Sequence, residues 1–153
     1  MKRLVYLSMI AVMALCAVSC KKHEDPVKTG FTADYPYTTK EAREAVSGLS
    51  WTSNAEYETT GVVYVKGRIT KITDYGHFQD SGTFGNATFY IASDATPGYV
   101  LYCYRILYLK GQKYVTGPDI EEGDTVIICG KLMNYKGNTP ETVALEAHLF
   151  ALN

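Results

Sequence analysis

Side chains that could bind a metal ion or move protons are grouped in one glycine-containing segment. Asp74, His77 and Asp80 follow one another at regular spacing, and carboxylate and imidazole groups serve both metal binding and acid–base catalysis. The other histidines lie far away in the sequence, and no Cys-x-x-Cys pair, nucleophilic serine motif or glycine-rich phosphate motif is present. Such residues in a loop commonly stabilise turns. The sequence therefore predicts a non-catalytic protein without a metal site or a cofactor.

The many tyrosines of the chain fit either a role in strands or a role in a binding surface. Thirteen Tyr stand against five Phe and one Trp. Tyr is frequent in strands and also at hydrated binding surfaces, because its ring is apolar and its tip is polar. Flat rings stack on nucleobases with about 1 to 3 kcal/mol each, and the same rings can stack on sugars. Which rings share a face depends on the register of the strands that carry them.

Residues 1–19 have the composition of a secretory signal. Two basic residues precede an uncharged apolar run over residues 4–18, which is short for a membrane span. The run ends in small residues directly before Cys20, and so resembles the lipobox of bacterial lipoproteins, where the cysteine is diacylated and becomes the first mature residue. We therefore expect a membrane anchor through a lipid on Cys20. Plain secretion with cleavage near Ser19 and an uncleaved anchor are the alternatives.

Residues 20–36 have the composition of a flexible tether, since basic and acidic side chains follow the cysteine directly. This charged segment resembles the signal by which some bacteria move lipoproteins to the outer face of the outer membrane. The expected location is the cell envelope, at the outer membrane and on either of its faces. Loss of the signal leaves 13 basic and 16 acidic residues, a formal net charge of −3. That balance is unlike a strongly basic nucleic-acid binder.

Two cysteines, Cys103 and Cys129, remain in the mature chain. An extracytoplasmic address permits a disulfide. Both residues lie in strand-like runs, however, and the alternation places Cys129 away from the core. Free thiols are therefore favoured over a bridge.

A single domain is predicted over residues 37–153, and it begins with a short helix. Thr38 and Glu41 have the spacing of a capping box, apolar residues continue to Val46, and Gly48 ends the helix. A helix of about ten residues is marginal by itself. We expect it to pack against a sheet.

Beyond residue 60, apolar and polar residues alternate with the period of two expected of strands. No alternation of strands and helices appears. In the first strand Ile72 is out of phase, which predicts a bulge near Gly67. A turn at Lys110 predicts a short additional strand over residues 113–116. The five main strands are predicted over residues 61–73, 86–93, 99–109, 124–134 and 142–152.

The start of the fourth strand indicates the fold. Gly123 and Asp124 supply a turn, and Gly130 allows close backbone approach where a barrel curves. Together with the long first strand, this pattern resembles the OB-fold, a five-stranded Greek-key barrel. The domain also resembles a family of secreted and lipid-anchored bacterial OB-fold domains of uncharacterised function, which implies an all-β fold with a small N-terminal helix. The likeness is carried by residues 104–109, 119–124 and 130–141.

The OB-fold resemblance also implies where a ligand would bind. In OB-folds, ligands lie across strands two and three and between the loops that join strands one to two and four to five. On that frame, the outward face of this sheet is aromatic and basic. The implied ligand-binding residues are Tyr64, Lys66, Arg68, Tyr90, Tyr102 and Tyr104 on strands, Tyr75 and Phe78 in the first loop, and Tyr135 and Lys136 in the second.

These residues predict a lipid-anchored module that binds an extended polymer, either an oligosaccharide or a single-stranded nucleic acid. The resemblance favours nucleic acid. The negative charge and the extracytoplasmic address favour oligosaccharide, because polyanion binding relies on Lys and Arg. The alternative is a structural lipoprotein whose Tyr-rich sheet docks on another envelope protein.

Overall fold

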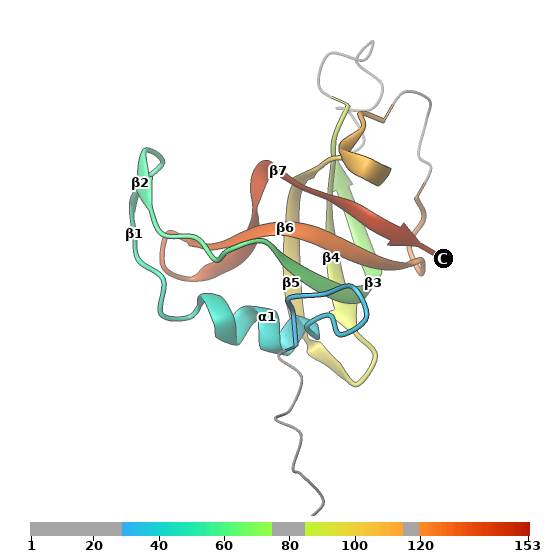
Figure 1. Cartoon of the computed structure of the whole chain (residues 1–153), viewed down its shortest axis with the longest axis horizontal. Coiled ribbons are helices and arrows are strands. Elements are labelled where there is room, and N and C mark those ends of the chain that lie inside the picture. Colours follow the sequence, from blue (N-terminus) through green and yellow to red (C-terminus); the bar gives the residue numbers. More distant parts are fainter. Residues whose placement is uncertain (1–28, 75–84, 115–119) are drawn as a thin grey trace, which may run out of the picture.

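Five strands close into a barrel in the computed structural model, which describes residues 29–74, 85–114 and 120–153 (Figure 1). Around the barrel the order is β3, β4, β5, β7, β6, and β6 pairs back with β3. The last strand therefore lies between the third and the fourth, as in the Greek-key barrel of the OB-fold. The predicted fold class is confirmed. The barrel strands are β3 (Val63–Asp74), β4 (Ala87–Ser93), β5 (Thr96–Ile106), β6 (Thr125–Tyr135) and β7 (Thr139–Leu152).

A short helix, α1 (Thr39–Val46), packs against one end of the barrel and contacts all five strands (Figure 1). The predicted capping box is present: the Glu41 backbone N–H donates to the Thr38 hydroxyl, and the Thr38 N–H donates to the Glu41 carboxylate at 2.7 Å. Ala42 and Val46 are fully buried in the barrel core. The helix thus closes the barrel end instead of standing free.

The predicted alternation is confirmed in most of the barrel. Side chains expected to face inward belong to one buried cluster, whereas Lys66 and Arg68 are exposed. This agreement follows from the period of two, because one face of each strand is the core. The confirmed inward residues include Val63, Val65, Ile69, Phe89, Ile91, Leu101, Cys103, Val126, Ile128, Leu132 and Leu149.

The bulge in β3 lies beyond the position predicted for it. Pairing with β4 is irregular after Ile69 and again after Ile72, so the extra residues are Thr70 and Thr73. The first bulge, at Thr70, shifts the phase of the strand so that Ile72 faces the core. Gly67 instead allows β3 to pack closely against β4, because a Cβ there would lie 3.1 Å from the Ala92 carbonyl oxygen.

In β7 the prediction is wrong at one residue. Leu145 was expected to face inward, but it is 44% exposed and has a φ of 63°. Gly130 of β6 pairs with Ala147, whereas Leu132 pairs with Thr142. Residues 143–146 therefore form a wide bulge in β7, and the inward phase resumes at Ala147.

Two local elements differ from the sequence prediction. A hairpin of β1 (Trp51–Ser53) and β2 (Glu56–Tyr57) stands beside the barrel (Figure 1) and had not been predicted. After β5 the chain forms a short 3-10 helix, η1 (Leu109–Gly111), and no strand forms at residues 113 and 114. Tyr114 is instead fully buried with its ring against Tyr108.

Cys103 and Cys129 are both free, as expected, and both are buried. Burial in the core raises the pKa of the Cys103 thiol far above its usual range. Cys129 lies outside the core cluster and pairs with Tyr64 on the neighbouring strand. Among the described residues, no helix has the length and apolar character needed to cross a membrane.

Candidate functional site

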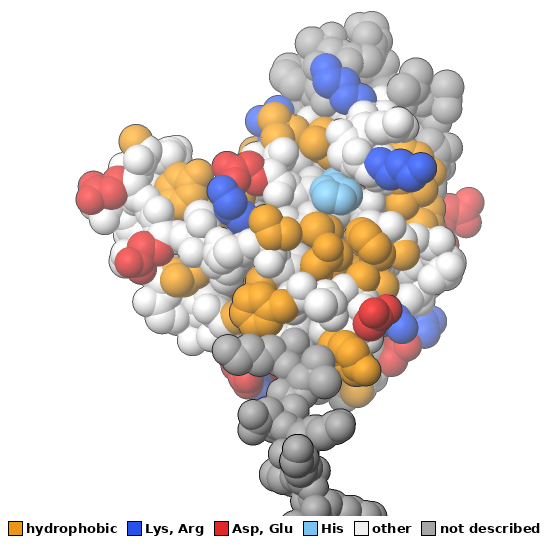
Figure 2. Space-filling model, in the orientation of Figure 1, with side chains coloured by type: hydrophobic (Ala, Val, Ile, Leu, Met, Phe, Trp, Pro, Cys, Tyr) orange, Lys and Arg blue, Asp and Glu red, His pale blue; other side chains and the backbone are white. Residues whose placement is uncertain are grey.

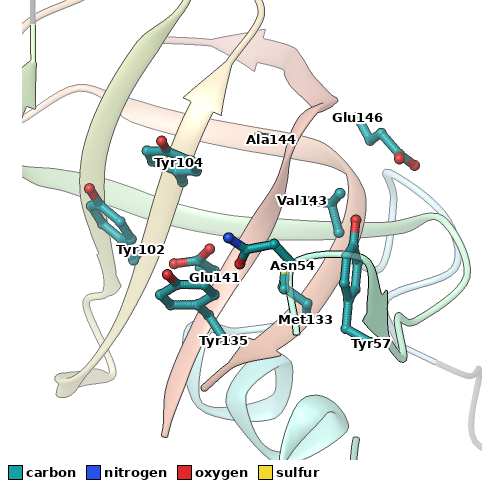
Figure 3. A pocket seen from close by; sticks show the side chains of 10 residues that line it. All are labelled: Asn54, Tyr57, Tyr102, Tyr104, Met133, Tyr135, Glu141, Val143, Ala144 and Glu146. Atoms are coloured by element: carbon teal, nitrogen blue, oxygen red, sulfur yellow. The ribbon is translucent and has the colours of Figure 1, made fainter. Parts of the chain in front are cut away.

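A groove of about 490 Å³ lies between the β1–β2 hairpin and the barrel (Figure 3). The hairpin forms one wall, β5 forms the opposite wall, and β6 and β7 lie between them. Four tyrosines and two glutamates give it a mainly aromatic and acidic lining. We call it the tyrosine groove, and its lining residues are Asn54, Tyr57, Tyr102, Tyr104, Met133, Tyr135, Glu141, Val143, Ala144 and Glu146.

The hairpin wall is held in place by contacts with β6. The Trp51 ring meets the Tyr135 ring edge-on at 5.5 Å between centroids. The Thr60 N–H donates to the Leu132 carbonyl at 2.9 Å, and the Leu132 N–H donates to the Thr60 hydroxyl at 3.0 Å. Asn54, in the hairpin turn, extends over the groove (Figure 3). The hairpin therefore completes a site that the barrel alone would leave open.

The opposite wall carries a row of stacked rings. Tyr102 lies 4.7 Å from Tyr90 and 5.8 Å from Tyr104, between ring centroids, with the rings inclined by 33° and 25°. Tyr104 is 37% exposed. Burial, together with the neighbouring Tyr90, raises the pKa of Tyr102. The row thus leads from the outer face of β4 to the groove, with ring surface available for stacking.

A buried acid, Glu141, lies at the floor of the groove. Its backbone pairs with Tyr102 on one side and Met133 on the other, and the residue is 6% exposed. The carboxyl is surrounded by Tyr102, Tyr104 and Tyr135 (Figure 3). Desolvation by this burial raises its pKa to about 7.

The wide bulge of β7 supplies the rest of the lining. Because residues 143–146 leave the regular ladder, Val143, Ala144 and Glu146 reach the groove. Glu146 also accepts from the Lys131 ammonium at 2.8 Å, and this hydrogen bond raises the pKa of Lys131. The Lys131 ammonium is therefore already paired with Glu146.

The structure brings together some of the residues that the sequence singled out. Tyr102, Tyr104 and Tyr135 line the groove, and Tyr90 adjoins it through the ring stack. The Lys136 ammonium lies 5.1 Å from the centroid of the Tyr135 ring. These residues come from the predicted second and third strands and from the loop between the fourth and fifth strands.

Tyr64, Lys66 and Arg68 lie elsewhere, around the β3–β6 pair. The Tyr64 ring contacts Phe150 at 5.2 Å, and the Arg68 guanidinium binds Asp94 at 3.0 Å. Lys66 and Arg68 line a separate hollow of about 220 Å³ beside α1's N-terminus. The expected single surface is thus divided in two. Cys20, Tyr75, Phe78 and the segment after Asp74 lie outside the described residues.

Sequence reasoning missed the hairpin residues and both glutamates of the groove. Tyr57 belongs to a strand of two residues and Asn54 to the turn before it, and both elements are too short for a visible alternation. Glu141 directly precedes the predicted start of the fifth strand, and so it was not assigned to that strand. The bulge that exposes Glu146 had no sequence signal, since apolar and polar residues continue to alternate through it.

No protein-family model matches this chain, and neither does any curated protein. In the part of the chain that the structure describes, no group of three His, Cys, Asp or Glu residues is arranged to hold a metal ion. The chemistry of the groove is therefore the basis for inferring function.

Proposed function

We propose that this chain is a non-catalytic, lipid-anchored binding module of the cell envelope, and that it binds an oligosaccharide in the tyrosine groove. The anchor is the lipid expected on Cys20, at the outer membrane. The likeness to secreted and lipid-anchored OB-fold domains supports this assignment. The observation that carries it is the combination of aromatic walls with acidic groups in one groove.

Sugars need both kinds of group. Their C–H faces pack on aromatic rings, and their hydroxyls donate hydrogen bonds to carboxylates or amides. Tyr104 supplies exposed ring surface, and Glu141 and Asn54 supply polar groups that point into the groove (Figure 3). Pockets of 300 to 1,000 Å³ are of the ordinary size for small-ligand sites, so the groove can take a few sugar units.

A single-stranded nucleic acid suits the tyrosine groove less well. Its phosphates need free cations, but the groove contains two carboxylates, and Lys131 is paired with Glu146. Two of the cations that the sequence assigned to this role, Lys66 and Arg68, lie at another face, where Arg68 is paired with Asp94. The third, Lys136, lies against the Tyr135 ring and not in the groove lining. The stacked tyrosines remain compatible with bases, so the two polymers must be compared directly.

The alternative function, docking on another envelope protein, is favoured by a second observation. Phe150 is 48% exposed against Tyr64, and Val62 is 53% exposed. Figure 2 shows apolar side chains gathered over the face of β6 and β7. This surface is distinct from the groove, and an apolar patch of this kind is typical of protein contacts.

Binding by the soluble chain from Lys21 onward tests the proposal, because every described contact lies within it. Arrays of glycans and of single-stranded oligonucleotides are probed with the wild type and with Tyr102→Ala/Tyr104→Ala. Tyr64→Ala, on the other face, is the matched control. We expect glycan binding that the double variant loses by at least about tenfold and the control retains.

Salt separates the two polymers. Binding that falls steeply between about 50 and 200 mM salt would assign the ligand to nucleic acid. No binding on either array, together with capture of an envelope protein that Tyr64→Ala abolishes, would establish the docking alternative instead.

A further inference from the structure

The Glu141 carboxyl is exceptional among the acids of the described chain. Three exposed acids there are paired with cations: Glu44 with Lys40, Asp94 with Arg68, and Glu146 with Lys131. Four others accept hydrogen bonds from backbone N–H groups: Glu41, Glu58, Glu122 and Asp124. Glu141 is more deeply buried than any of these, yet no described side chain forms a hydrogen bond or ion pair with its carboxyl. A buried carboxylate without a partner is strongly disfavoured. A positively charged ligand would therefore supply the partner that this carboxylate lacks.

The rings around Glu141 favour the same charge. Tyr102, Tyr104 and Tyr135 surround the carboxyl, and Tyr57 forms the facing wall (Figure 3). Aromatic faces attract ammonium groups within about 6 Å of the ring centroid. The groove's own Tyr135 already holds an ammonium, that of Lys136, at 5.1 Å. Rings and acid together are the arrangement that recognises a cation.

Few groups of the chain within the groove could pair with the Glu141 carboxyl in place of a ligand. The Lys131 ammonium is bound to Glu146, and Asn54 contributes a neutral amide. Among the described residues that line the groove there is no Lys, Arg or His. A cation that completes Glu141 must therefore come with the ligand.

We propose that the floor of the tyrosine groove is an ammonium subsite, and that the oligosaccharide it selects carries free amino groups, as glucosamine does. This inference rests on the proposed sugar-binding function and adds the class of sugar. The amino group binds between the Glu141 carboxylate and the tyrosine rings, while the pyranose face stacks on Tyr104. An N-acetylated sugar carries no charge at this position and leaves the carboxyl without a partner.

Calorimetric titration of the chain from Lys21 onward tests this subsite. The ligands are a hexamer of glucosamine, the N-acetylglucosamine hexamer and the glucose hexamer with the same linkage, between about pH 6 and 8. We expect the glucosamine hexamer to bind at least about tenfold more tightly than the other two. Glu141→Gln should remove that preference, so that the glucosamine hexamer binds no more tightly than the two neutral hexamers. Glu56→Gln, an exposed acid outside the groove lining, is the matched control.

The outcomes separate the two proposals. Equal binding of all three hexamers, or a preference that survives in a folded Glu141→Gln variant, overturns the ammonium subsite and leaves sugar binding intact. Equally tight binding of a lysine pentapeptide would show that the groove reads charge alone, and would overturn the sugar assignment. If none of the hexamers binds and the glycan array is also silent, the proposed function itself fails. Thermal unfolding of each variant verifies that a loss of binding is not a loss of fold.

Discussion

Glu141 is the residue in which burial and function conflict most directly. The residue is 6% exposed, and burial raises the pKa of its carboxyl from 4.5 to about 7. The folded chain therefore keeps a proton that the unfolded chain loses above pH 4.5. By linkage, the stability of the fold falls as the pH rises from about 4.5 to about 7, and the deficit is complete above pH 7.

The free energy of unfolding should show this dependence. In urea titrations from pH 4.5 to 8, we expect wild type to lose about 1 to 2 kcal/mol that Glu141→Gln retains, after allowance for water at the groove mouth. Tyr57, Tyr102, Tyr104, Tyr135 and Glu146 also line the groove with this carboxyl, and comparison with the variant removes their contribution. Parallel curves for the two proteins would contradict the raised pKa.

Gly130 gives a second prediction at the scale of one residue. A Cβ there would collide with the Cα and Cβ of Ala147 in the adjacent strand. We expect Gly130→Ala to lower the free energy of unfolding by about 1 to 3 kcal/mol, as overpacking does. Gly61→Ala, where nothing lies within 4 Å, is the control. Equal denaturation midpoints for the two variants would show that β7 can move away at no cost.

At the scale of elements, the regular alternation of the strands could be predicted from the sequence, but the bulge that interrupts this alternation could not. The inward phases of the barrel strands could be predicted from alternation, and the capping box of α1 from two residues, Thr38 and Glu41. The bulge at residues 143–146 could not, because Leu145 continues the alternation while its backbone turns outward. Three groove tyrosines were therefore predicted, but neither of its acids was.

The hairpin wall can be tested through its anchor. Trp51→Ala removes the ring contact with Tyr135, while the barrel ladder is unchanged. We expect ligand affinity to fall by about two- to tenfold, because an aromatic pair contributes about 0.5 to 1.5 kcal/mol beyond its buried area. Circular dichroism should show the barrel intact. Unchanged affinity would mean that the hairpin is not part of the site.

At the scale of the whole molecule, the predicted binding face is divided between two sides of the barrel. Alternation along β3 correctly turned Tyr64, Lys66 and Arg68 outward, but it could not say which neighbouring strand they would share a face with. The barrel's curvature decides this, since the first half of β3 pairs with β6 and the second half with β4. Closure of a sheet is a property of all strands together.

The barrel and the hairpin should also differ in stability. The hairpin pairs through two residues on each strand, whereas the barrel is a closed ladder, and small units with few pairings open first. Trp51 is the single tryptophan of the chain, so its fluorescence reports on the hairpin alone. We expect its urea transition to precede the far-ultraviolet circular dichroism transition. Coincident transitions would indicate one cooperative unit.

The wide bulge of β7 has a consequence for how such a site could diversify. The hairpin and residues 143–146 form walls of the groove, yet neither belongs to the regular ladder that closes the barrel. Changes in their length or composition should therefore leave the scaffold folded while altering what the groove accepts. Proteins that share this barrel could therefore acquire different ligands through changes in these two segments, so that binding selectivity evolves separately from folding.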